Sequence, residues 1–443
     1  MICVCTPLRR VNQILLVFTA REHKGRKRKI LFSFMSTFSP RVVAILPRLC
    51  PSTWINIVKP LVALHEAGRV RAWVTLESMA SPRDVDKADL LVFCRNVRPD
   101  RAELLRAAIT VGVPVLYDLD DNFFELPPDS ASGRAFAQPE QLAMLTEYLT
   151  AASLVRVYSR PLLASAGRLN SHVEMVAGAV DLHQVRQPAK LPGGPVKLIY
   201  ATSRLDDSLG RIFLPALRRL MDEEGPRVEA HFWGPRPPAE LPAVRHHGVV
   251  HNYDRFLRRF SAAGFEIGLA PLADDVFHRS KTNTKFREYG ACGIAGIYSD
   301  VEVYSDCVRH GETGLLVAND AEAWYRALRQ LVDDANLRKK IQQQARLEIE
   351  NHYSQEIFES VFLRQIEQLV GRVRPQRIIE THAVDARLRQ PRLARLVRLI
   401  PQGIGCLRRK GWARCWNALR WIGSSSWSMA CLQWRLRKGW NES

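Results

Sequence analysis

The sequence lacks any continuous apolar stretch of about 18 residues, which is the length that a membrane-spanning helix needs. Its first apolar run, 14–20, is also short for the core of a secretory signal, and no small-residue cleavage pattern follows it. We therefore expect no spanning helix in this chain of 443 residues.

The sequence also lacks the common motifs that hold metal ions or dinucleotides. Its nine cysteines form no Cys-x-x-Cys pair, and its 12 histidines form no His-Glu-x-x-His motif. No Gly-x-Gly-x-x-Gly follows the first expected strand. An odd number of scattered cysteines is typical of free thiols in a reducing compartment. We expect neither a metal ion nor a cofactor.

Acidic residues are scarce at the two ends of the chain. Residues 1–40 carry eight Lys/Arg and one acid, and residues 371–443 carry sixteen and three. These ends account for the whole net charge of +19, so residues 41–370 are nearly neutral. A neutral centre argues against a core that binds nucleic acid, and basic ends are typical of segments that meet an anionic surface. We interpret 1–40 as a poorly ordered basic extension.

The basic tail 371–443 also holds six of the ten tryptophans of the chain. Residues 392–399 alternate arginine with leucine and valine, as in a basic amphipathic helix. Tryptophan rings favour the membrane interface, and Lys/Arg favour anionic headgroups. We expect a cytoplasmic protein held peripherally on the inner face of the plasma membrane by this tail. Packing against the core, a disordered tail and stacking on RNA remain alternatives.

Between the two ends, buried-strand patterns alternate with helical patterns, which predicts parallel α/β sheets. The Pro/Gly-rich stretch 187–195 separates two such series. The first has strands at 42–46, 70–76, 89–94, 114–117, 154–157 and 173–176, with helices at 54–67, 100–111, 139–152 and 161–169. The second has strands at 196–201, 228–233 and 266–269, with helices at 207–221, 253–263, 322–333, 335–353 and 358–370.

This pattern predicts two Rossmann-like domains. We place the N-terminal domain at 41–186, the linker at 187–195, and the C-terminal domain with its closing helices at 196–370. In sheets of this kind, ligands bind beyond the carboxyl ends of the strands. Candidate site residues are therefore sought directly after the strands.

Three aspartates follow the fourth strand of the first series, within Asp118-Leu-Asp-Asp121. They could bind a metal as an Asp-x-Asp motif, although that motif belongs to a fold with a single sheet. Asp120 and Asp121 could instead face the interdomain cleft and contact an acceptor or act as a base. They could also simply cap the next segment and accept hydrogen bonds from loop amides.

A second candidate lies at 280–300, where a polar loop enters a short helix and a glycine-rich turn. Lys285 and Glu288 are three residues apart, so they share one helix face. The N-terminus of the helix and Lys285 suit a phosphate, and Glu288 suits sugar hydroxyls. The alternative is an exposed salt bridge between the two residues.

Several motifs give the chain a likeness to a known family. Residues 283–294 read Asn-Thr-Lys-Phe-Arg-Glu-Tyr-Gly-Ala-Cys-Gly-Ile, and Ser-Asp follows at 299–300. Residues 310–317 read His-Gly-Glu-Thr-Gly-Leu-Leu-Val. Together these resemble the C-terminal domain of GT-B glycosyltransferases of the family 4 type. Residues 115–121 resemble the N-terminal domain of bacterial polysaccharide glycosyltransferases. The implied fold is GT-B, with two Rossmann-like domains that face a cleft.

The resemblance implies roles for individual residues. Glu288 would hold the ribose hydroxyls of a nucleotide-diphospho-sugar donor, and Lys285 would lie near the diphosphate. Asn283 falls within the same motif, and Arg204 is the nearest candidate for a second phosphate ligand. Ser280 stands where the family commonly has a glutamate that binds the donor sugar.

The implied activity is the transfer of a hexose, with retained anomeric configuration, to a glycan or lipid-linked acceptor. Such a reaction belongs to cell-surface polysaccharide biosynthesis in bacteria. The nucleotide sugar would be a substrate and not a cofactor. Ser280 favours one rival, a non-catalytic nucleotide-sugar-binding or scaffold protein of such a pathway. An epimerase or a phosphorylase on the same fold is another rival.

Overall fold

The computed structural model describes residues 39–372, apart from 129, 137, 189–192, 203–206, 235, 239–240 and 242. It also describes the strands between residues 7 and 33, and residues 432, 433 and 436. The chain divides into two compact units, Met1–Pro40 and Arg41–Ser443. The remaining predictions for the tail 371–443, including its amphipathic helix, concern residues outside the described ranges.

The first unit contains an antiparallel sheet, β1-β2-β3. Its strands are β1 (Pro7–Arg10), β2 (Gln13–Arg21) and β3 (Lys27–Ser33). The prediction of a poorly ordered extension over 1–40 did not include these strands. The apolar run of β2 is rich in aliphatic and aromatic residues, which favour strands when a partner strand is present.

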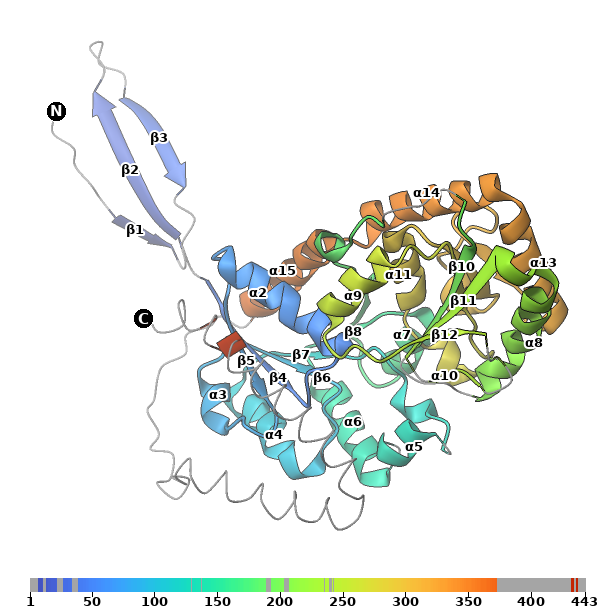
Figure 1. Ribbon diagram of the computed structural model, residues 1–443. Helices are drawn as coiled ribbons and strands as arrows, with labels where there is room; N and C mark the ends of the chain where they lie inside the picture. Colours follow the sequence, from blue (N-terminus) through green and yellow to red (C-terminus); the bar gives the residue numbers. More distant parts are fainter. Residues whose placement is uncertain are drawn as a thin grey trace. The chain divides into compact units, whose positions relative to one another are not determined.

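The second unit begins with a parallel sheet in the order β5-β4-β6-β7-β8-β9 (Figure 1). Each strand predicted for the first series forms at or near its expected position. The strands are β4 (Arg41–Leu46), β5 (Arg71–Leu76), β6 (Leu90–Cys94), β7 (Val115–Asp118), β8 (Leu154–Val157) and β9 (Val173–Met175).

Helices connect these strands, as parallel pairing requires. The short helix α1 (Pro51–Thr53) continues through the π-helix η1 (Trp54–Val58) into α2 (Lys59–Glu66). The others are α3 (Pro82–Asp86), α4 (Ala102–Val111), α5 (Ala131–Phe136), α6 (Pro139–Ala151) and α7 (Arg160–Gly167). Helix α4 ends at Gly112, whose φ of 71° lies in the left-handed region that glycine adopts without steric cost.

A second parallel sheet follows in the order β12-β11-β10-β13-β14-β15. Its strands are β10 (Val196–Ala201), β11 (Val228–Trp233), β12 (Arg245–His247), β13 (Ile267–Ala270), β14 (Ala295–Ser299) and β15 (Leu315–Val317). Its main helices are α8 (Asp207–Glu224), α9 (Tyr253–Ala262), α11 (Thr284–Cys292), α13 (Ala321–Asp333) and α14 (Ala335–His352). Two four-residue helices, α10 (Val276–Arg279) and α12 (Glu302–Ser305), complete it.

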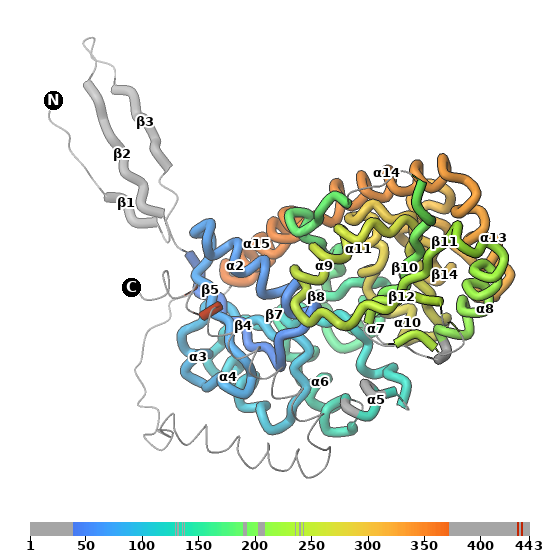
Figure 2. Tube along the Cα trace, in the orientation of Figure 1, coloured from blue at the N-terminus to red at the C-terminus, as the bar shows by residue number. Residues whose placement is uncertain are grey.

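The last helix, α15 (Gln355–Arg372), returns to the first sheet. Its side chains Phe358 and Phe362 pack on the guanidinium of Arg156, which lies on β8. The sequence pattern alone groups this helix with the C-terminal domain, but its contacts are with the N-terminal sheet and α2. The tube in Figure 2 follows α15 beside α2.

Three apolar clusters form the core. One lies between β4, β6, β7 and the helices α4 and α6, and another lies between the second sheet and the helices α8 and α13. The third contains residues of both sheets, among them Val42 and Leu116 of the first sheet and Ile199 and Ala270 of the second. The two sheets thus share an apolar core where the chain crosses between them. Within the described ranges, no helix is both long and apolar enough to span a bilayer.

Candidate functional site

Each sheet has one point where the strand order reverses, and this is where α/β sheets bind ligands. In the first sheet the reversal lies between β4 and β6, and in the second it lies between β10 and β13. The candidate aspartates lie at the end of β7 and in the loop that follows it. The loop after β13 leads through α10 to α11, which holds Lys285 and Glu288.

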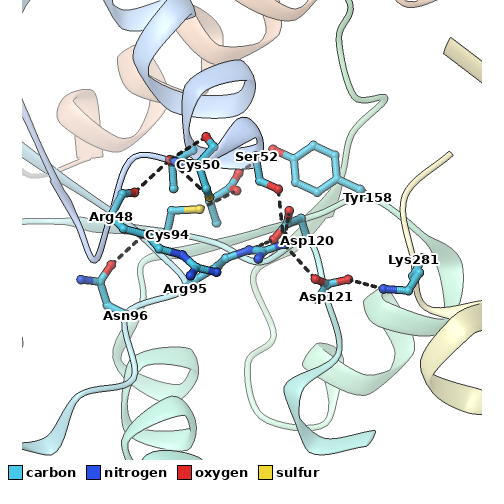
Figure 3. Close-up of polar contacts among 12 residues, drawn as sticks. Arg48, Cys50, Ser52, Cys94, Arg95, Asn96, Asp120, Asp121, Tyr158 and Lys281 are labelled. Carbon is cyan, nitrogen blue, oxygen red and sulfur yellow. Dashed lines mark hydrogen bonds and ion pairs between the residues drawn. The ribbon is translucent and has the colours of Figure 1, made fainter. Parts of the chain in front are cut away.

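Arg95 organises the strand ends of the first sheet (Figure 3). It follows β6 directly and has a φ of 60°, which is uncommon for a residue with a side chain. Its guanidinium donates to Asp120 Oδ2 at 2.6 Å, Asp121 Oδ2 at 2.8 Å and Ser52 Oγ at 3.3 Å. These hydrogen bonds offset the backbone strain, and they connect the ends of β4, β6 and β7. Arg95 was missed by sequence reasoning, since only its unusual backbone conformation marks it.

Asp120 and Asp121 occupy different environments in this cluster. Asp120 is buried, and both of its carboxylate oxygens accept hydrogen bonds from Arg95. Asp121 is partly exposed and pairs on one side with Arg95. On the other side Asp121 Oδ1 lies 3.2 Å from the ammonium of Lys281, which comes from the second sheet. Asp121 is therefore the aspartate that reaches the other half of the molecule.

The third aspartate, Asp118, is fully buried. It accepts hydrogen bonds from Arg156 Nε and from the hydroxyl of Tyr158, both at 2.6 Å. Arg156 thus neutralises Asp118 and Arg95 neutralises Asp120, which argues against the Asp-x-Asp metal interpretation. In the part of the chain that the structure describes, no cluster of three or more His, Cys, Asp or Glu side chains could hold a metal ion.

Lys285 and Glu288 lie on α11 as the spacing predicts. Lys285 Nζ lies 2.6 Å from Glu288 Oε2, and the hydroxyl of Tyr253 donates to Glu288 Oε1 at 3.1 Å. The Glu288 side chain is only 4% exposed and that of Lys285 is 25% exposed. The salt bridge of the alternative interpretation therefore forms, but its carboxylate is buried and not exposed. Burial, followed by the nearby Glu288 carboxylate, raises the pKa of Tyr253 well above its ordinary value, so Tyr253 stays a donor.

Asn283 supports this helix from its N-cap position. Its Oδ1 accepts a hydrogen bond from Arg287 Nε at 3.0 Å. Arg287 is buried, and it also donates to the carbonyl of Ala179 and to Thr282 Oγ1. It thereby fixes the start of α11 to the segment that follows β9. The sequence offers no signal for this role, because the contact spans more than a hundred positions.

Ser280 lies at the contact between the loops of the two sheets. Its hydroxyl donates to Val276 O at 2.8 Å and lies 3.4 Å from Asn122 Nδ2, while its carbonyl accepts from Ser159 Oγ at 2.8 Å. Ser280 is only 1% exposed. The last candidate, Arg204, lies outside the described residues.

Comparisons with known proteins agree with this architecture. Residues 284–348 match the family profile described as Glycosyl transferases group 1. No curated protein matches the sequence at a significant level.

Three solved structures resemble the whole two-domain fold. Sucrose-phosphate synthase from Thermosynechococcus elongatus has a TM-score of 0.58 at 16% identity, over 75% of this chain and 100% of that chain. Anabaena HepE in complex with UDP and glucose has a TM-score of 0.56 at 12% identity, over 74% and 99%. A putative UDP-N-acetylglucosamine 2-epimerase from Listeria monocytogenes has a TM-score of 0.51 at 12% identity, over 76% and 98%. These likenesses confirm the predicted GT-B type of α/β fold.

Proposed function

We propose that this protein is a glycosyltransferase that moves a sugar from a nucleotide-diphospho-sugar donor to a glycan or lipid-linked acceptor. The observation that carries the proposal is the contact of the buried Glu288 with Lys285 and Tyr253; Lys285 and Glu288 lie within the family match at 284–348. Anabaena HepE, a structural neighbour, binds UDP and glucose, which supports a nucleotide-sugar donor.

Each residue of the cluster has a chemical role in this proposal. The Glu288 carboxylate accepts hydrogen bonds from the vicinal ribose hydroxyls of the donor. Lys285 and the free backbone amides at the start of α11 stabilise the diphosphate as it departs, since its negative charge rises in the transition state. Tyr253 holds Glu288 in place. Transfer with retained configuration, in bacterial polysaccharide synthesis, is part of the same proposal.

The strand ends of the first sheet would face the acceptor. Asp120 is held by Arg95 at both oxygens, so we assign it a structural role. Asp121 contacts the donor half through Lys281 and is the better candidate for a group near the acceptor.

The test is an assay of transfer and donor hydrolysis with a panel of nucleotide sugars. We expect turnover with at least one donor, and a loss of about a hundredfold or more in kcat/KM for Glu288→Gln and Glu288→Ala. Full activity of both variants would contradict the assignment of Glu288. Release of the free sugar nucleotide epimer, without transfer, would indicate an epimerase.

A non-catalytic nucleotide-sugar-binding protein is the second candidate. Ser280 favours it, because a buried serine in the contact between the sheets occupies the position where a donor-binding glutamate is expected. Tight binding of a nucleotide sugar without turnover, over a broad set of acceptors, would support this candidate.

The basic tail is proposed to bind an anionic membrane surface. Deletion of 371–443 should abolish sedimentation with vesicles that contain anionic lipid, because arginine and tryptophan side chains supply the attraction. Vesicles of zwitterionic lipid are the control. Unchanged sedimentation of the truncated protein would contradict the proposal.

A further inference from the structure

Lys281 is a cation of the second sheet that the proposed donor site does not use. It lies in the loop between α10 and α11, three residues before the first residue of α11. Its ammonium lies 4.0 Å from the centre of the Phe277 ring and 3.2 Å from Asp121 Oδ1. It therefore links the start of the donor-binding helix to the strand ends of the first sheet (Figure 3).

The two lysines beside α11 are held with different strength. Lys285 pairs at 2.6 Å with Glu288, a carboxylate that is only 4% exposed, so removing its ammonium would leave a buried charge. Lys281 pairs at 3.2 Å with Asp121, and these two side chains are 30% and 17% exposed. Partly exposed ion pairs contribute little free energy, roughly 0–1 kcal/mol. Lys281 is thus the lysine that can change its partner at low cost.

Asp121 tolerates the loss of Lys281. Its other oxygen, Oδ2, lies 2.8 Å from Arg95, so one cation remains beside the carboxylate when Lys281 leaves. Arg95 is in turn fixed by Asp120 and Ser52. Asp121 can therefore lose its ion pair with Lys281 and still keep the ion pair with Arg95, so its partly buried negative charge stays balanced.

We propose that Lys281 is a diphosphate-binding cation, and that donor binding moves its ammonium from Asp121 to the diphosphate of the donor. A diphosphate carries more charge than one carboxylate, and it would also meet the free amides at the start of α11. The exchange breaks one of the links between the two halves, and it moves one positive charge away from Asp121, the residue proposed to lie near the acceptor. Donor binding therefore changes the charge on the acceptor side. This inference rests on the proposed function.

Two substitutions test the exchange, and they have opposite expected effects. Lys281→Met removes a cation from the diphosphate, and we expect the Kd for UDP to rise about ten- to a hundredfold. Asp121→Asn removes the competitor for Lys281, and we expect the Kd for UDP to fall about two- to fivefold, the value of a partly exposed ion pair. Isothermal titration calorimetry with UDP on the full chain measures both.

The double variant and a matched control complete the experiment. In the Lys281→Met background, Asp121→Asn should leave the Kd for UDP unchanged, since no lysine remains to be released. Arg279→Met is the control, because it removes one positive charge two residues away from an exposed pair with Asp274. Its Kd should equal that of the wild type. Thermal unfolding of each variant shows whether it is folded.

The outcomes separate this inference from the proposed function. A wild-type protein that binds none of UDP, GDP and ADP overturns the proposed function. If the wild type binds one of them, that nucleotide becomes the probe. An unchanged Kd in Lys281→Met then overturns only the exchange, and so does an Asp121→Asn variant that binds more weakly than the wild type.

Discussion

The strand ends of the two sheets hold their charges in different ways. In the first sheet, arginines hold the aspartates. Arg156 and Asp118 are both fully buried, and Asp120 is held at both oxygens by Arg95. Beside the second sheet the cations are lysines: Lys285 pairs with Glu288, and Lys281 pairs with Asp121 of the first sheet. The Lys281 and Lys285 side chains are both a quarter or more exposed.

This difference indicates that the charged residues of the first sheet serve to hold the structure, whereas the lysines beside the second sheet are suited to binding an anion. An arginine fork holds a carboxylate at two points, and its planar geometry makes the pair rigid. A lysine is a single charge on a flexible stem, and it can turn toward an incoming anion. We infer that the first sheet supplies fixed geometry and that the second sheet supplies exchangeable charge. The predictions below test that contrast, from the largest expected effect to the smallest.

The Arg156–Asp118 pair should give the largest loss of stability. Arg156→Met leaves a buried carboxylate without its cation and removes the contact with Phe362 on α15. We expect the free energy of unfolding to fall by about 3–5 kcal/mol. Urea unfolding measures it, with Arg106→Met as the control. Arg106 pairs with Glu147 on the surface, and its loss should lower the free energy of unfolding far less than the loss of Arg156. Equal losses in the two variants would remove the basis for a rigid framework.

Lys285 should show an intermediate effect. Lys285→Met leaves Glu288 buried, with Tyr253 as its remaining hydrogen-bond partner among the described residues, and we expect a loss of about 2–3 kcal/mol in unfolding free energy. Adding Glu288→Gln should restore about half of the loss, because the uncompensated charge disappears. The double-mutant cycle is measured by urea unfolding. If the second substitution makes the protein less stable still, the pair is not coupled as the structure indicates.

Low pH should lower the stability of the second sheet, because His231 on β11 is buried in its neutral form. Burial lowers the pKa of His231 to about 4, against the opposing effect of Glu229. The unfolded chain, with an ordinary histidine pKa near 6.5, therefore binds more protons than the folded one between pH 6.5 and 4. Stability is full above pH 6.5 and is lost as the pH falls toward 4. Between pH 7 and 5 this loss is about 2 kcal/mol.

Hydrogen exchange of β11 measures this effect. We expect faster exchange in Val228–Trp233 at pH 5 than at pH 7, after correction for the intrinsic rate, and a smaller difference in β6 of the first sheet. His231→Phe keeps an aromatic ring in the stack with His247 and should reduce the difference in β11. If β6 and β11 respond alike, the acid sensitivity does not come from His231.

The smallest effect on stability is expected at Lys281. Its ion pair with Asp121 is partly exposed, so Lys281→Met should change the free energy of unfolding by less than about 1 kcal/mol. Urea unfolding of this variant, compared with Lys285→Met, separates a cation that stabilises the fold from one that is available to a ligand. A loss as large as that of Lys285→Met would assign Lys281 to the framework.

The local signals in the sequence predict the strands and helices of the second unit well. Continuous apolar runs such as 90–94 are buried strands, because both faces of a parallel sheet are covered. Helix α4 ends at Gly112 as its sequence indicates. The short edge strand β12 (Arg245–His247) is not predicted, since its polar residues lie at the edge of the sheet and give no apolar run.

Local sequence patterns do not predict contacts between residues that are far apart in the chain. The return of α15 to the first sheet depends on Arg156, which lies about two hundred positions earlier in the chain. The roles of Arg95 and Arg287 likewise depend on partners that the sequence does not place beside them. A pattern of residues shows which faces are apolar, but the partner of a buried charge is known only when the chain is folded.

The sequence by itself determines the two α/β series, the position of Lys285 and Glu288 on one helix face, and the concentration of positive charge at the two ends. These follow from periodicity and composition, which act over a few residues. Only the tertiary structure decides which charges are buried and which can exchange. In the folded chain Glu288 is buried and accepts a hydrogen bond from Tyr253, and Arg95 donates hydrogen bonds to Asp120. Lys281 of the second half pairs with Asp121 of the first. The strength of an ion pair depends on its exposure to water, and exposure is a property of the whole fold.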